Sequence, residues 1–380
     1  MNKSRTFGLL AVLVFVMSFS GGLYGGAEEG EIPFRMLGHL MTVTVKINDL
    51  PQNYNFVVDT GGVTFVDKKL ADELQLKQVG SQAKINTLYL SGFSIENIFC
   101  FTTFDFSHFS SLSVPIHGII GSNLLERFVT TFDFHNHMMM LSSETLDLEK
   151  PARGLWMKFK NHRVNNAPVV DLKINGNLKE AMIDTGQPHT LVLPIETFEK
   201  YVSVDFTYYI KSKGLMEKWP GNKVNFNYMA RMKTLELAGA KFDNTLCLFG
   251  DLPSMLSMPL IGTDFLSQFK IIINFPKDEM VMIPNQDFNL KDNLFSLGLN
   301  AILSENNQVF VGGIWKNSPA DKAGIRVDDI IVSFNSRKVT LDNLLELQNI
   351  LLDDNVETIE LEVISQGKKR GVLLKKEFLF

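Results

Sequence analysis

The chain has 380 residues, of which 45% are hydrophobic and 21% are charged, and it carries a formal net charge of −5. This length and composition are those of a globular protein with two or three domains and large apolar cores. The charge is mild and the sequence has no long basic block and no basic stripe interleaved with aromatic residues, so nucleic acid is not an expected partner.

The first segment has the pattern of a secretory signal peptide. Lys3 and Arg5 precede the apolar run FGLLAVLVFVMSF at 7–19, and the segment ends in Gly and Ala at 25–27, before two acidic residues. The run is shorter than the roughly 20 residues that a membrane-spanning helix needs. We therefore predict a cleaved signal peptide at 1–27 and an exported protein that works in the periplasm or outside the cell. An uncleaved membrane anchor is the alternative.

The first motif is FVVDTGG at 56–62, in which Asp59 follows an apolar run. Such a run is typical of a buried strand, and the glycines allow a sharp turn where the strand ends. The segment AMIDTGQ at 181–187 repeats the pattern and places Asp184 in the equivalent position. Because a given tripeptide occurs by chance roughly 0.1 times in a chain of this length, two copies indicate a common cause, which is either catalysis or a structural turn.

The repetition extends well beyond the two aspartates. Three further pairs of segments match in the same order: VKIN at 45–48 with LKIN at 172–175, LSGFSIENIFCF at 90–101 with LAGAKFDNTLCL at 237–248, and GIIGSNLLERF at 118–128 with PLIGTDFLSQF at 259–269. Repeats of about 110 residues are too long for a solenoid. The duplication therefore predicts two related lobes, of which the second has an insertion around 208–226.

Two smaller features leave more than one interpretation open. Cys100 and Cys247, the only cysteines, occupy equivalent positions in the two copies. They either form a disulfide where the copies meet or stay free and buried, and we favour free thiols. His135 and His137 could bind a metal, but a polar turn between strands is favoured because no further ligands follow at a suitable spacing. We predict no metal and no other cofactor.

An Asp-Thr-Gly after an apolar strand, followed later by two apolar residues and a glycine at 119–121 and again at 260–262, resembles the retropepsin-like aspartic peptidases. The resemblance covers roughly 38–285. It implies a mainly β fold with two pseudo-twofold-related β-barrel lobes, at 38–148 and 160–285, whose Asp loops meet at the axis. It also implies an aspartic endopeptidase that hydrolyses polypeptide substrates, with Asp59 and Asp184 as the catalytic carboxylates.

The resemblance assigns roles to the neighbours of the aspartates as well. Thr60 and Thr185 would make hydrogen bonds that lock the loops together, and Gly61 and Gly186 would let each backbone approach the partner loop. Two carboxylates about 3 Å apart share one proton. In that state one carboxylate can draw a proton from a water molecule while the other bonds the scissile carbonyl. No HExxH or GxSxG motif offers a competing mechanism.

The position after each Asp-Thr-Gly departs from the family pattern. It is usually Ala or Ser and lines the substrate site, whereas here it is Gly62 in the first copy and Gln187 in the second. A Gln187 amide that reaches between the carboxylates would displace the water, which would favour a catalytically inactive, peptide-binding scaffold. An amide that points away leaves the enzyme interpretation intact. A third interpretation is a precursor whose cleft is covered by its own C-terminal part.

Aspartic peptidases also need a hairpin that closes over the substrate. In the first copy, the order of elements predicts a short one near 80–85. In the second copy, the insertion at 208–226 predicts a larger cover. Trp219 in this insertion is expected either to contact the substrate or to pack within a surface hairpin.

The remaining residues, 292–380, form a further unit after a linker at 284–293. NSPADKAGIRVDDIIVSF at 317–334 and the helical pattern LDNLLELQNILL at 341–352 resemble a PDZ domain. The resemblance implies a groove that takes a peptide C-terminus as an added strand. Leu297, Gly298 and Leu299 match its carboxylate-binding loop, although Ser296 stands where glycine is common. We predict substrate recruitment or regulation, with a purely structural role as the alternative.

Overall fold

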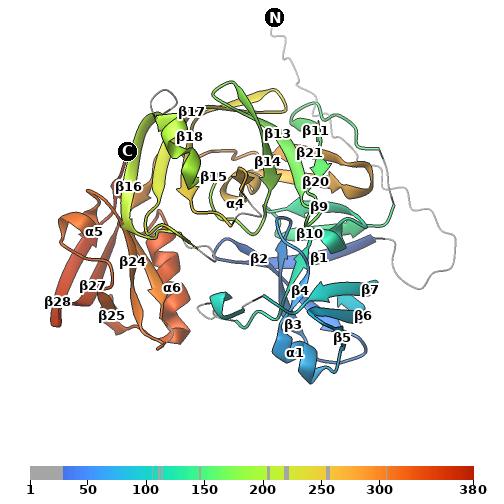
Figure 1. Cartoon of the computed structure of the whole chain (residues 1–380), viewed down its shortest axis with the longest axis horizontal. Helices are drawn as coiled ribbons and strands as arrows, with labels where there is room; N and C mark the ends of the chain where they lie inside the picture. Colours follow the sequence, from blue (N-terminus) through green and yellow to red (C-terminus); the bar gives the residue numbers. More distant parts are fainter. Residues whose placement is uncertain are drawn as a thin grey trace, which may run out of the picture.

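The structure is a computed structural model that describes residues 29–104, 106–109, 112, 114–144, 147–202, 206–217, 222–253, 257–304 and 306–380. The predicted signal peptide at 1–27 and Trp219 lie outside these residues. The chain is mainly β, and most of its strands belong to two large sheets, with a few helices beside and between the strands (Figure 1). None of the described helices is long and apolar enough to cross a membrane.

The first repeat, 29–142, is built on strands with alternating apolar residues. In β2 (Leu40–Ile47), Val43, Val45 and Ile47 are buried while the residues between them face solvent. β3 (Tyr54–Asp59) is buried at its centre and pairs in parallel with β8 (Gly118–Gly121). The other elements are β1 (Glu29–Leu37), β4 (Phe65–Val66), α1 (Lys68–Glu73), β5 (Lys77–Val79), β6 (Gln82–Leu90), β7 (Phe93–Phe101), η1 (Phe106–Phe109), α2 (Ser122–Leu125), β9 (Val129–Asp133) and β10 (Met138–Ser142).

The second repeat, 155–284, has the same strand pairings as the first. β13 (Pro168–Ile174) pairs with β14 (Asn177–Ile183), which pairs in parallel with β19 (Leu260–Ile261), as β2, β3 and β8 do. The hairpin of β16 (Phe206–Gly214) and β17 (Tyr228–Leu237) takes the place of β5 and β6. The other elements are β11 (Leu155–Lys158), β12 (Lys160–Asn161), β15 (Leu191–Pro194), η2 (Ile195–Thr197), α3 (Phe198–Val202), β18 (Ala240–Gly250), α4 (Thr263–Leu266), β20 (Phe269–Asn274), η4 (Phe275–Lys277) and β21 (Glu279–Pro284).

A shared sheet joins the two repeats. Its strand order β11-β21-β20-β9-β10-β1 is symmetric about the antiparallel pair of β9 and β20, in which Thr131 faces Ile272. Strand pairing extends both repeats beyond the boundaries predicted at 38 and 160, because β1 begins at Glu29 and β11 begins at Leu155. One apolar core runs through both repeats, so the two repeats form one body.

The C-terminal domain has a core of its own but is not a separate body. Helix α6 (Leu341–Leu352) begins with a capping box made by Thr340 and Asn343 and buries Leu344 and Leu347. The domain's β24 (Val309–Trp315) pairs with β16, so its sheet continues into the second repeat. The other elements are β22 (Phe295–Ser296), β23 (Leu299–Leu303), α5 (Pro319–Lys322), β25 (Ile330–Phe334), β26 (Arg337–Lys338), β27 (Thr358–Ser365), β28 (Lys368–Lys375) and β29 (Glu377–Phe378).

Candidate active site

Each of the two predicted aspartates lies where a strand of its repeat ends in a tight turn. Asp59 is the last residue of β3, and Asp184 directly follows β14. Each side chain accepts a hydrogen bond from its own loop, since Gly61 N donates to Asp59 Oδ1 at 2.8 Å and Gly186 N donates to Asp184 Oδ1 at 2.9 Å. These bonds hold both carboxyl groups in a fixed direction.

The structure brings the two carboxyl groups into contact. Asp59 and Asp184 are hydrogen bonded to each other through their side chains, and Asp184 is only 8% exposed. Burial raises the pKa of both groups, and the charge of Asp59 together with the hydrogen bond to it raises the pKa of Asp184 further. Two carboxyl groups in this arrangement hold one proton between them. The pair therefore has one protonated and one ionised member at neutral pH.

The two threonines lock the loops together reciprocally. Thr60 Oγ1 donates to Ile183 O at 2.8 Å and accepts from Thr185 N at 3.1 Å. Thr185 Oγ1 donates to Val58 O at 3.0 Å and accepts from Thr60 N at 3.0 Å. Both threonines are fully buried, so each bond is made away from competing water. The four bonds fix the spacing of the two aspartates.

Glycines make room for the carboxyl groups. A Cβ atom on Gly61 would lie 2.3 Å from Asp184 Cγ, and one on Gly186 would lie 2.7 Å from Asp59 Cγ. At Gly62 a Cβ atom would lie 2.6 Å from Asp59 Oδ2. Real Cβ atoms do not approach other heavy atoms this closely. The glycines at 61 and 186 therefore leave room for the opposite carboxyl group, and a side chain at 62 would have to shift the Asp59 carboxyl oxygen.

The apolar-apolar-glycine segments at 119–121 and 260–262 lie next to the strands that lead into the two Asp loops. Asp59 faces Gly121 across the parallel pair of β3 and β8. The short helices that follow begin at the loops, because Ser122 N donates to Gly62 O at 2.9 Å and Thr263 N donates to Gln187 O at 2.7 Å. In each repeat, the residues of this sequence pattern thus hold the Asp loop in place through strand pairing and backbone hydrogen bonds.

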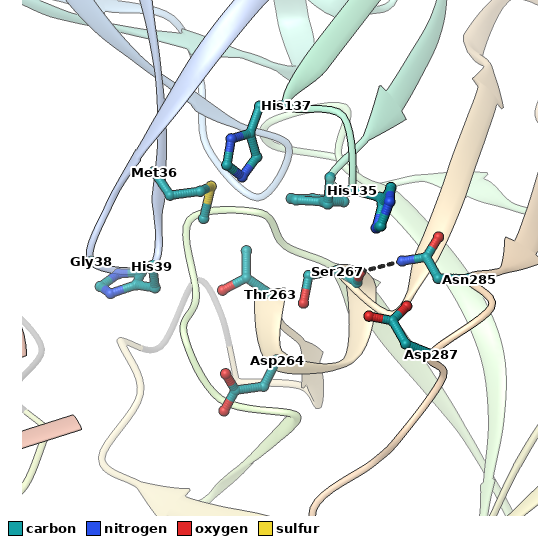
Figure 2. Close-up of a pocket in the computed structure, with 11 residues that line it drawn as sticks. Met36, Gly38, His39, His135, His137, Thr263, Asp264, Ser267, Asn285 and Asp287 are labelled. Carbon is teal, nitrogen blue, oxygen red and sulfur yellow. Dashed lines mark hydrogen bonds between the residues drawn. The ribbon is translucent and has the colours of Figure 1, made fainter. Parts of the chain in front are cut away.

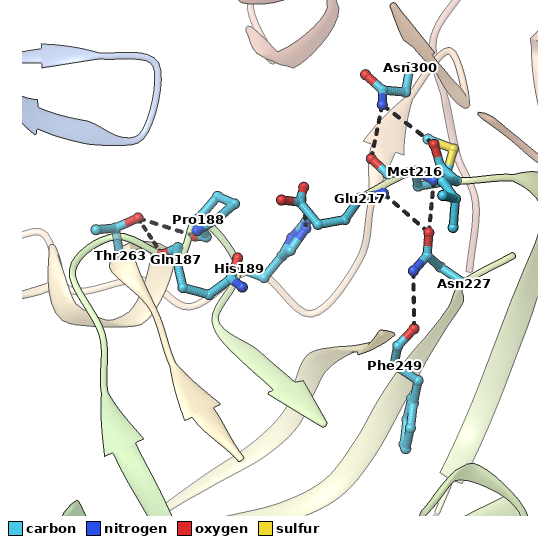
Figure 3. Close-up of polar contacts among 10 residues, drawn as sticks. Gln187, Pro188, His189, Met216, Glu217, Asn227, Phe249, Thr263 and Asn300 are labelled. Carbon is cyan, nitrogen blue, oxygen red and sulfur yellow. Dashed lines mark hydrogen bonds and ion pairs between the residues drawn. The ribbon is translucent and has the colours of Figure 1, made fainter. Parts of the chain in front are cut away.

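Gln187 does not bond to the carboxyl groups through its side-chain oxygen. The residue is 4% exposed, and its Oε1 atom is buried with no hydrogen-bond partner in the described part of the chain. Its side chain runs from the loop toward His189 (Figure 3). Its backbone N–H, by contrast, donates to the backbone carbonyl of Asp184 at 3.3 Å and lies close enough to the Asp184 carboxyl group to lower its pKa. The backbone of Gln187 therefore supports the dyad, while its amide lies with the neighbouring side chains.

Sequence reasoning missed two residues that reach the Asp loops from the opposite repeat. Asn165, in the turn before β13, donates from Nδ2 to Gly61 O and is 7% exposed. His39, in the equivalent turn before β2, is hydrogen bonded to the backbone of Gly186. Burial lowers the pKa of His39 to about 4, so this imidazole is neutral at pH 7. No local motif marks either residue; only the duplication, which makes the two turns equivalent, could have paired them.

A cavity of about 340 Å³ lies beside this region and contains the histidines singled out in the sequence (Figure 2). His135 and His137 come from the turn between β9 and β10, His39 from the β1–β2 turn, and Asp264 from α4. Within the described ranges, no three histidine, cysteine or acidic side chains are grouped so as to hold a metal ion. Cys100 and Cys247 are free and buried, as favoured from the sequence.

The two predicted hairpins differ in size and in attachment. The short one turns at Gly80 between β5 and β6, where the sequence predicts it. The long one is β16–β17, and its tip carries Glu217, which lies 3.7 Å from His189 on the Asp184 loop (Figure 3). The long hairpin is therefore in contact with the loop it is predicted to cover. The predicted contact of Trp219 lies outside the described residues.

The predicted carboxylate-binding loop is tightly built. Leu297 and Leu299 are buried, and Gly298 has φ +79° with a Cβ position only 2.1 Å from Ser318 Cβ. Gly298 N donates to Ser296 Oγ at 2.9 Å, so the serine that replaces the usual glycine satisfies this N–H. On the α6 side of β23, Gln348 Nε2 donates to Ala301 O at 3.1 Å. A peptide strand added to this edge has to displace the Gln348 amide.

Comparison with models of known protein families matches residues 310–364 to a PDZ domain. The C-terminal prediction is thereby confirmed, and a PDZ domain gives the chain a peptide-binding or regulatory part. A search of curated proteins finds none that matches this chain. The function of the duplicated part therefore has to be argued from its geometry.

Proposed function

We propose that the chain is an aspartic endopeptidase that hydrolyses peptide bonds of polypeptide substrates through Asp59, Asp184 and a water molecule. The observation that carries the proposal is the hydrogen-bonded pair of buried carboxyl groups at equivalent strand ends of two repeats. A pair of structural turns would not need to bury two acids against each other, because burying a charge costs free energy unless it is compensated.

The mechanism follows from the single proton that the pair holds. The ionised carboxylate of the pair accepts a proton from the bound water, which attacks the scissile carbonyl carbon, while the protonated carboxyl group donates a hydrogen bond to the carbonyl oxygen. The proton taken from the water then goes to the leaving amine, and the pair returns to its starting state. The chain supplies both acids itself, so one molecule contains the whole site.

The strand pairings support the retropepsin-like interpretation of the fold. Six pairings of the first repeat recur one for one in the second, including the parallel pair beneath each aspartate. We interpret the repeats as two β-barrel lobes of that family, related by a pseudo-twofold axis between β9 and β20. The signal pattern at 1–27 supports export, in which case the substrates are polypeptides outside the cytoplasm.

The scaffold interpretation requires the Gln187 amide to occupy the place of the water. The Gln187 side chain runs from its loop toward His189 (Figure 3). We therefore favour the enzyme. The PDZ domain adds a second peptide site, and recruitment of substrates through their C-termini is the role we propose for its groove.

Replacing either aspartate tests the dyad. Asp59→Asn and Asp184→Asn should each lower kcat for a peptide substrate by at least about a hundredfold, since general acid–base catalysis contributes 10² or more. The double variant should be hardly worse than either single one, because the two groups act as a unit. Asp171→Asn, at an exposed position of β13, is the matched control and should keep full activity.

Mixing the two single variants tests whether one chain holds the whole site. No cleft in the mixture contains two aspartates, so activity should stay lost. Recovery on mixing would show a dyad formed between chains, and substantial activity in either single variant would refute the paired-carboxylate mechanism.

A further inference from the structure

The tip of the β16–β17 hairpin is held by two different parts of the molecule (Figure 3). Asn300, on β23 of the PDZ domain, donates from Nδ2 to Met216 O at 3.1 Å and to Leu215 O at 3.5 Å. The next residue, Glu217, faces His189 on the Asp184 loop. Three successive residues thus connect the strand that forms one wall of the peptide groove with the candidate active site.

Residues 216 and 217 near the tip are fixed by one side chain of the same hairpin. Asn227 is fully buried, and its Oδ1 accepts hydrogen bonds from Met216 N at 2.8 Å and Glu217 N at 3.1 Å. Its Nδ2 donates to Phe249 O at 3.4 Å, which ties the tip to β18. Because one side chain fixes both backbone N–H groups, Met216 and Glu217 move together. A shift of the Met216 carbonyl therefore also shifts the Glu217 carboxylate.

The outer strand of the hairpin, β16, is paired with the sheet of the PDZ domain. β16 pairs with β24, Leu215 N donates to Gly312 O at 2.9 Å, and Lys213 forms a 2.5 Å ion pair with Asp321. The close crossing needs glycine, because a Cβ atom on Gly313 would lie 2.5 Å from the Leu215 carbonyl carbon. Trp315 of β24 is 3% exposed and packs in the same apolar cluster as residues of the second repeat.

We infer that the PDZ domain positions the cover of the candidate active site, and that Asn300 is the positioning residue through which its groove strand holds the hairpin tip. The inference rests on the proposed peptidase function. Recruitment alone predicts that short peptides without a suitable C-terminus do not need the PDZ domain. Positioning predicts that every substrate needs it, because an unsupported cover does not close correctly over the cleft. A peptide bound along β23 acts on the same strand that carries Asn300.

The test is Asn300→Asp in the full chain. The change removes the donor and sets a carboxylate against two carbonyl oxygens, which should push the hairpin tip away. With a short peptide amidated at its C-terminus, so that the groove has no carboxylate to bind, kcat/KM should fall about tenfold or more. Asn306→Asp makes the same chemical change at an exposed position of the same domain and should leave kcat/KM unchanged.

Hydrogen–deuterium exchange separates this inference from the proposed function. In Asn300→Asp the amides of 209–216 and 228–232 should exchange several-fold faster, while those of β9 and β20 stay protected as in the unaltered chain. Gly313→Ala acts on the same crossing from the backbone and should give the same local change. If the unaltered chain cleaves no peptide, the peptidase proposal fails, yet the exchange still tests the positioning. Hairpin exchange that matches the Asn306→Asp control in both variants would overturn the inference.

Discussion

The two Asp loops have the same residues and hydrogen bonds where they face each other, and different residues where they face the hairpins. Thr60 and Thr185 make mirrored bonds, and Gly61 and Gly186 both leave room for the opposite carboxyl group. The residue after them is Gly62 in one loop and the buried Gln187 in the other. The second loop is in contact with the long hairpin through His189 and Glu217. The contacts between the two Asp loops are therefore symmetric, whereas the residues that surround the two loops differ.

The asymmetry extends to the residues that cross between the repeats. Asn165 offers a neutral amide to the first loop, whereas His39 offers a titratable imidazole to the second. His39 also lies near Glu217 and His189, so that the second loop is surrounded by groups whose charge depends on pH. In the proposed peptidase, both loops have to hold a carboxyl group at one spacing, which explains why they match. The proposed cover contacts the second loop through Glu217 and His189.

The largest expected effect concerns the mirrored threonine hydrogen bonds between the two Asp loops. Thr60→Val and Thr185→Val each remove one donor and one acceptor and leave a buried N–H and a buried C=O unpaired, at about 1–3 kcal/mol each. Each variant should therefore lower the free energy of unfolding by about 2–6 kcal/mol, measured in urea. Thr44→Val, at an exposed position of β2, is the control. Destabilisation by only one of the two would show that the loops are not equivalent.

An intermediate effect concerns the shared proton. The pKa of Asp184 in the folded protein lies above its ordinary value of 3.8, because of burial and the Asp59 charge. The stability contributed by this group is present below that value and is lost as the pH rises through the raised pKa. Asp184→Asn, which cannot ionise, should therefore gain stability relative to the unaltered chain above about pH 4, by about 1.4 kcal/mol per unit of raised pKa.

Urea unfolding of both proteins from pH 4 to pH 8 measures this difference. A gap that stays constant over the whole range would mean that Asp184 carries no raised pKa. Asp171→Asn, at its exposed position, should show no such trend.

The smallest effect concerns the contact between His189 and Glu217, which belongs to the second Asp loop alone among the described residues. Burial lowers the pKa of His189, but the attraction of the Glu217 carboxylate 3.7 Å away outweighs it, so the pKa is raised overall. The attraction between them is present below pH 6.5 and is lost as the pH rises through the raised pKa. Glu217→Gln should therefore cost about 1 kcal/mol at pH 5.5 and less at pH 8.5. His39 and Asp264 also face His189 and stay unchanged in this variant.

Unfolding free energies at the two pH values measure this effect, with Glu199→Gln at an exposed position as the control. An equal cost at both pH values would show that the contact of Glu217 with His189 does not depend on the charge of the imidazole.

The sequence by itself determined the duplication, the positions of both aspartates and the PDZ domain. These features are encoded locally: an apolar run buries a strand, glycines turn the chain at its end, and the same pattern recurs in the same order. The threonine bonds between the loops followed only from the family resemblance, yet the structure contains them because the two loops repeat the same motif face to face.

Only the tertiary structure decided what surrounds the dyad. Asn165 reaches Gly61 across 104 positions of the chain, and Asn300 reaches Met216 across 84. The pairing of β16 with β24 joins two domains that the sequence presents as separate. Such contacts depend on how distant surfaces meet, and a single polar side chain carries no periodic pattern that announces its partner. The loops that hold the two aspartates are therefore encoded by local sequence, whereas the attachment of the β16–β17 hairpin arises from packing between domains.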